Sequence, residues 1–152
     1  MVEMVMVVTL VTVLSVFLGK LLLSGVDAYD FATKRKQALR QSRIALAEIT
    51  RDLRQIRDSS SITAATQNSI TFTNTDGEEI TISLSGSRVL RNNIPVARQV
   101  TQFSLTYYDQ DGNQLEFPIQ DLTKIRIIRI NLAIQVDQQR VQLHTEVHPR
   151  NL

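Results

Sequence analysis

The chain has 152 residues, a formal net charge of +2 and no cysteine. This length leaves room for one domain and one additional element. The small net charge does not by itself indicate nucleic acid as a partner. The lack of cysteine excludes disulfide bonds and thiolate metal sites. Hydrophobic residues make up 43% of the chain, but they are concentrated in residues 1–25, and the rest of the sequence is more polar.

Residues 4–25 are predicted to form a membrane-spanning helix. No charged residue occurs in this stretch before Lys20. About 22 residues at 1.5 Å each span roughly 33 Å, which matches a hydrocarbon core of about 30 Å. A cleavable signal peptide would begin with basic residues and carry a shorter apolar run. A buried helix of this length would need a larger soluble domain around it. We therefore expect residues 1–25 to be a transmembrane helix.

Glu3 lies directly before this apolar run. A carboxylate is costly in lipid unless it stays at the interface or meets a cation. The residues alone leave both roles open: Glu3 lies among headgroups, or it pairs with a positive group of a neighbouring subunit. Basic residues follow the helix and none precedes it, so the positive-inside tendency places the following domain in the cytoplasm. These residues are Lys34, Arg35, Lys36, Arg40 and Arg43.

An amphipathic continuation of the helix is predicted over residues 26–58. One largely apolar face is formed by residues that recur at spacings of three and four. These residues are Leu39, Ser42, Leu46, Ile49, Leu53 and Ile56. The polar face is rich in arginine, with Glu48 and Asp52 as its acids. Arg51, Arg54 and Arg57 form a possible basic contact face. This face is either a solvated surface or a site for anionic headgroups or acidic patches. Nucleic acid has weaker support, because no aromatic residues interleave with the charges.

Residues 59–152 are predicted to form a β-rich globular domain of six or seven antiparallel strands. Apolar residues alternate with polar ones, and turn residues separate the runs. The sequence Asn-Thr-Asp-Gly at 74–77 is a hairpin signal. The longest predicted strand covers residues 125–136, and a turn at 137–139 returns it to a last strand. The expected fold class is therefore α+β, with a long helix packed on an antiparallel sheet.

Metal and catalytic sites find little support in the sequence. Asp109, Asp111 and Asn113 superficially resemble a calcium loop, but the EF-hand spacing is missing and Asp-Gly is ordinary turn chemistry. His144 and His148 are four residues apart, which in a strand separates them by about 13 Å. No nucleophile elbow or phosphate loop occurs. We expect no enzyme activity, no metal and no cofactor.

Several segments in order resemble the type IV pilin-like proteins, specifically minor pilins and the J-type minor pseudopilins of type II secretion. The first is Met-Val-Glu-Met-Val at residues 1–5, which resembles the start of the family's mature helix. The others are residues 88–92 with 94–97, residues 100–109 with the Asp-Gly at 111–112, and the ending at 147–152. The likeness covers both ends and most of the β region. The family's basic leader, its cleavage glycine and its first two mature residues would lie upstream of Met1.

The resemblance implies a structural subunit that helps initiate or cap a type IV pilus or a type II secretion pseudopilus. Its partners would be other pilin or pseudopilin subunits, the bacterial cytoplasmic membrane, and prepilin peptidase if a leader exists. Glu3 would neutralise the N-terminal ammonium of an adjacent subunit. The globular domain would lie on the periplasmic or extracellular side, which reverses the positive-inside prediction. The alternative is a membrane-tethered binding module, for example for DNA. A membrane-anchored enzyme is a third hypothesis, for which no site can be named.

Overall fold

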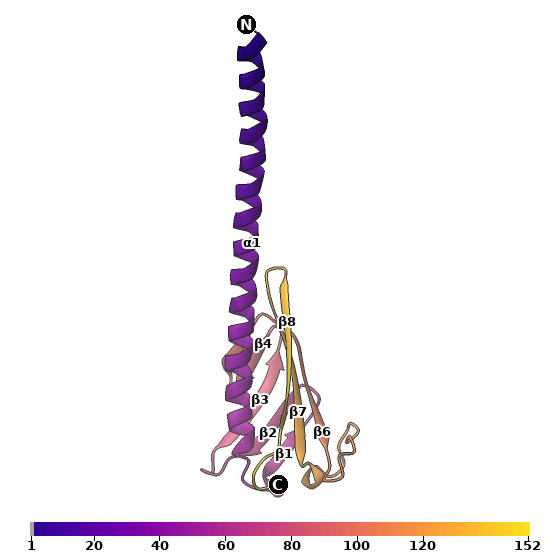
Figure 1. Ribbon diagram of the computed structural model, residues 1–152. Coiled ribbons are helices and arrows are strands. Elements are labelled where there is room, and N and C mark those ends of the chain that lie inside the picture. Colours follow the sequence, from indigo (N-terminus) through magenta and orange to yellow (C-terminus); the bar gives the residue numbers. More distant parts are fainter. Residues whose placement is uncertain (1) are drawn as a thin grey trace.

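The computed structural model describes residues 2–152 and contains one long helix and two antiparallel sheets (Figure 1). This arrangement confirms the predicted α+β fold, and the described residues form eight strands in place of the six or seven expected. The helix is α1 (Val2–Arg54). One sheet contains, in order, β1 (Ile62–Ala65), β2 (Ser69–Thr73), β3 (Glu79–Ser85), β4 (Arg88–Arg91) and β5 (Ile94–Arg98). The other contains, in order, β6 (Val100–Tyr108), β7 (Ile127–Val136) and β8 (Gln139–Val147).

Helix α1 is unbroken for 53 residues. Its N-terminal half projects away from the β domain, and its C-terminal half lies along the domain (Figure 1). It packs mainly on β7 and β8 and also contacts β5. The helix ends at Arg54 rather than at the expected residue 58. The reason is that Ile56 leaves the helical path to form a β-bridge with Asn74, which buries its side chain completely.

The buried face of α1 largely follows the predicted spacing. Ser42, Leu46, Ile49 and Leu53 are buried, whereas Leu39 is only partly covered. Ser42 tolerates burial because its hydroxyl donates a hydrogen bond of 2.9 Å to the carbonyl of Ala38. Asp52 differs from the prediction: it belongs to the buried face and not to the polar face, with only 2% of its side chain exposed.

The β region folds through the turns that the sequence predicted. β2 and β3 pair up to Thr73 opposite Glu79, and the Asn74 side chain organises the loop between them. Its Oδ1 accepts hydrogen bonds from the backbone N–H groups of Asp76 and Glu78 at 3.0 and 2.8 Å. β7 and β8 meet at Val136 opposite Gln139. The expected strand over 125–136 begins only at Ile127, since a short 3-10 turn occupies Leu122–Lys124.

A single hydrophobic core joins the helix to both sheets. Tyr107 of β6 is fully buried in it, and its hydroxyl donates to the carbonyls of Thr66 and Ser69 at 3.0 and 3.3 Å. Burial raises the pKa of the Tyr107 phenol, so the ring stays neutral. Because Thr66 and Ser69 flank the β1–β2 connection, this side chain ties the two sheets together.

Candidate functional site

The projecting half of α1 is an exposed apolar rod. Its most apolar stretch has a mean hydropathy of 2.4 with none of its residues buried, so the helix is long and apolar enough to cross a membrane. The polar residues in this stretch are satisfied within the helix. Thr9, Thr12 and Ser15 each donate to the carbonyl four residues earlier, at 2.9, 2.7 and 2.8 Å. Hydroxyls bonded in this way do not present an unpaired donor to an apolar environment.

Glu3 lies in the first turn of this rod and is exposed. Among residues 2–152, no lysine, arginine or histidine nitrogen comes within 4.0 Å of its carboxylate. The next charged residue along the helix is Lys20, which is also exposed. The structure thus leaves both roles of Glu3 open, at a lipid interface or against a cation of another subunit.

An ion-pair cluster connects the β domain to α1 just after the apolar stretch of the helix. The Lys34 ammonium lies 2.5 Å from the Asp137 carboxylate in the β7–β8 turn and 2.8 Å from Asp30 one helical turn earlier. These two hydrogen bonds raise the pKa of Lys34, with Asp137 the larger cause. The tip of the β7–β8 hairpin is therefore held against the helix.

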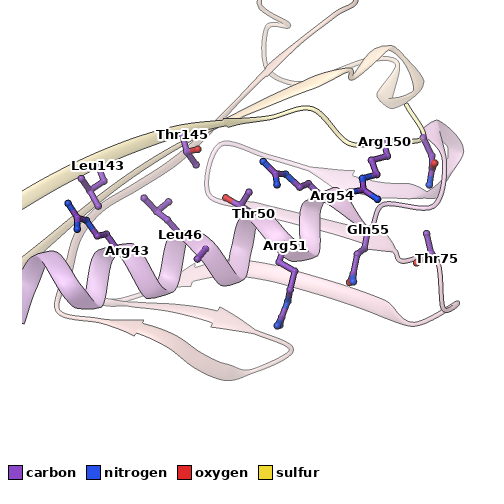
Figure 2. Close-up of a pocket in the computed structure, with 12 residues that line it drawn as sticks. Arg43, Leu46, Thr50, Arg51, Arg54, Gln55, Thr75, Leu143, Thr145 and Arg150 are labelled. Atoms are coloured by element: carbon purple, nitrogen blue, oxygen red, sulfur yellow. The ribbon is translucent and has the colours of Figure 1, made fainter.

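A groove of about 880 Å³ runs between α1 and β8 with the segment that follows it (Figure 2). We call it the arginine groove, because Arg43, Arg51, Arg54 and Arg150 line it together with no acidic residue. Its apolar lining consists of Leu46, Ala47 and Leu143, and its remaining lining is Thr50, Gln55, Thr75, Thr145 and Asn151. The Asn151 amide donates to the carbonyl of Ile56 at 3.3 Å, which holds the C-terminal segment against the end of the helix.

The predicted basic face is only partly assembled in this groove. Arg51 and Arg54 line it, whereas Arg57 does not and instead extends toward Asp58, with 3.9 Å between Nε and Oδ2. Figure 2 shows Arg43 and Arg54 on the side of α1 that faces β8, with Arg51 pointing away from them. Arg150 was not assigned to this face from the sequence, because nothing local indicates that the chain end returns to the helix.

A largely buried ion pair lies next to Arg51. The Arg91 Nε on β4 donates to the Asp52 carboxylate at 2.6 Å, and this hydrogen bond raises the pKa of Arg91. Arg51 lies farther from the other carboxylate oxygen, at 3.8 Å. The pair connects the helix to the five-stranded sheet. The signal in the sequence is the position of Asp52, which stands directly beside Leu53 and three residues after Ile49 and so falls on the buried stripe.

The remaining candidate ligands, which the sequence places in the turn after β6 and near the chain end, do not line the arginine groove. The Asp109 carboxylate accepts from the backbone N–H groups of Asp111 and Asn113 at 2.9 and 2.8 Å, which shapes the turn after β6 and lowers the Asp109 pKa. His144 is exposed in β8, and His148 follows the end of that strand. Over residues 2–152, no group of three or more metal-ligating His, Asp or Glu side chains occurs.

Comparison with known proteins adds no assignment. The chain matches no protein-family model, and no curated protein matches it.

Proposed function

We propose that this protein is a minor pilin or pseudopilin, a filament subunit that helps initiate or cap a type IV pilus or a type II secretion pseudopilus. The observation that carries the proposal is the continuity of α1 from its exposed apolar half into its domain-bound half. A simple anchor needs about 20 apolar residues and tolerates a flexible linker. A subunit that packs in a helical array needs its domain held in a fixed position relative to the packing rod.

Two features of the rod support assembly. Its side chains are apolar on all sides, which suits both lipid and the core of a helical bundle. The Lys34 cluster and the Asp52–Arg91 pair join the domain to the helix at two heights, in addition to the packing of α1 on β7 and β8, which favours a fixed position of the domain relative to the rod. The resemblance of residues 1–5 and of the β region to pilin-like proteins points in the same direction.

Glu3 has a specific role in this proposal. When subunits leave lipid and pack through their rods, a carboxylate in the apolar core is tolerable only if it is paired. The N-terminal ammonium of an adjacent subunit is the cation that we propose for it. Other pilin or pseudopilin subunits are then the direct partners. The protein resides in the bacterial cytoplasmic membrane before assembly, with its globular domain on the periplasmic or extracellular side, and prepilin peptidase removes any leader.

The test uses photocrosslinking along the rod in the native cells. Phe17, which is 67% exposed, is replaced by p-benzoylphenylalanine so that light captures whatever packs against it. We expect crosslinks to pilin-like subunits, identified by mass spectrometry. Glu3→Gln should lower their yield about tenfold or more, because removal of one partner of a desolvated charge pair costs about 2–5 kcal/mol. Membrane fractionation should stay unchanged.

The matched control is Glu116→Gln, which removes the same charge from an exposed position in the β domain. It should leave the crosslink yield unchanged. Crosslinks of normal yield in Glu3→Gln would refute the pairing role while leaving the filament proposal in place. Crosslinks to lipid alone, in cells that assemble filaments, would refute the filament proposal and indicate an anchored domain.

A further inference from the structure

The arginine groove carries positive charge that the described part of the chain does not compensate. Among residues 2–152, no carboxylate lies within 4.0 Å of Arg43, Arg54 or Arg150. The carboxylate nearest to Arg51 belongs to Asp52 at 3.8 Å, and Arg91 already binds it at 2.6 Å. Guanidinium groups gathered in a groove without acids form a site for an anionic ligand.

The position of the groove excludes membrane lipid as that ligand. Arg43 follows Gly25, the end of the predicted membrane-spanning segment, by 18 residues. At 1.5 Å per residue this places it about 27 Å along the helix axis from the hydrocarbon edge. A helix tilt of about 40° still leaves roughly 20 Å. The headgroup layer is only about 5–8 Å thick on each side.

The lining of the groove favours a protein segment over nucleic acid. No aromatic residue lines it, whereas single-stranded nucleic acid is usually held by bases stacked on aromatic rings. The apolar side chains of Leu46, Ala47 and Leu143 instead suit the side chains of a peptide. The volume of about 880 Å³ is within the usual range for binding pockets and too small for a duplex to enter.

The groove also lies beside an open sheet edge. Within residues 2–152, β8 is the last strand of its sheet and pairs only with β7, so the backbone groups of its outer edge have no strand partner there. Leu143 and Thr145 of this strand line the groove (Figure 2). An extended segment placed there gains main-chain hydrogen bonds from the edge strand, as in β-strand addition.

We infer that the arginine groove binds an extended acidic segment of a partner protein, which runs beside β8 and meets Arg43, Arg54 and Arg150 with its carboxylates. The groove forms within one chain, so this inference does not depend on filament assembly. It also gives a function to Arg43 and Arg150, which take no part in the proposed packing of the rod or in the pairing of Glu3.

The test measures binding of a labelled peptide to the full chain in nanodiscs of zwitterionic lipid. The probe is a fluorescein-labelled peptide of alternating Glu and Thr, which places every carboxylate on one face of an extended strand. Fluorescence anisotropy should show salt-sensitive binding. The triple variant Arg43→Gln, Arg54→Gln and Arg150→Gln should weaken it about tenfold or more. A thymidine oligonucleotide of equal charge should bind more weakly than the peptide.

The control neutralises Arg88, Arg98 and Lys124, which are exposed basic residues outside the groove and away from β8, and so makes the same change in net charge. It should alter peptide affinity less than twofold. A charge reversal keeps the test decisive if the triple variant folds poorly: Arg54→Glu should gain affinity for a Lys-Thr peptide. An equal loss in the control, tighter binding of the oligonucleotide, or no binding of the acidic peptide would each overturn the inference.

Discussion

Loss of the Arg91 side chain should destabilise the protein through the buried carboxylate that it leaves behind. Asp52 is 2% exposed and Arg91 is 29% exposed, with 2.6 Å between them. Removing one partner of a buried pair costs about 3–5 kcal/mol, since the other charge remains without compensation. For Arg91→Ala we expect about 3 kcal/mol of lost unfolding free energy, because Arg51 at 3.8 Å offers only partial compensation.

Loss of the Asp52 side chain should lower the unfolding free energy less than loss of the Arg91 side chain. Asp52→Ala leaves Arg91 at a partly exposed position, from which the guanidinium reaches water, so the expected loss is smaller, about 1–2 kcal/mol. The exposed pair of Arg129 and Glu146, at 41% and 43% exposure, provides the reference. Glu146→Ala should cost about 1 kcal/mol or less, because water screens such pairs.

Unfolding of the full chain in detergent, followed by circular dichroism, measures these differences. Arg91→Ala should lower the unfolding midpoint by about 10 °C, and Glu146→Ala by only a few degrees. The double variant Asp52→Ala, Arg91→Ala should cost less than the sum of the single variants, since it removes both charges. A loss in Arg91→Ala no larger than in Glu146→Ala, or strict additivity in the double variant, would refute the proposed pairing.

Three further predictions concern the β7–β8 hairpin, the turn after β6 and the side of the membrane on which the domain lies. Asp137→Asn removes the main hydrogen-bond acceptor of Lys34 and should speed amide hydrogen exchange at the β7–β8 tip near neutral pH. The stability from this pair is fully present below the ordinary lysine pKa of 10.5 and is lost only as the pH rises through the raised pKa of Lys34. Unchanged exchange in Asp137→Asn would contradict the role of the pair. The Asp109 pKa lies below 3.8 because Asn113 donates to its carboxylate, so the Asp109 contribution is present above about pH 4 and is lost as pH falls through the lowered value. Asp109→Ala should therefore destabilise the protein at about pH 7, and this loss of stability should shrink as the pH falls below about 4, as read from urea midpoints; a loss that does not change with pH would count against this linkage. Ser87→Cys introduces a sole cysteine at an exposed position, and it should react with an impermeant maleimide in intact spheroplasts. Labelling only after permeabilisation would place the domain in the cytoplasm.

Local pattern was sufficient for the parts of the fold that depend on neighbouring residues. The apolar run predicted the projecting helix, and the spacing of Ser42, Leu46, Ile49 and Leu53 identified its buried stripe. The residues 74–77 and 137–139 marked two hairpins that the structure confirms. These features follow from helix and strand periods and from turn chemistry, which act over a few residues.

The sequence by itself thus determined the long helix, the β-rich domain behind it and the isolated position of Glu3 at the apolar end. Only the tertiary structure decided that the strands divide into two sheets, that Asp52 is buried against Arg91, and that Arg150 lines the same groove as Arg43 and Arg54. The physical reason is that these contacts join segments far apart in the chain. Their formation depends on how the complete core packs, and no local period or composition encodes that outcome.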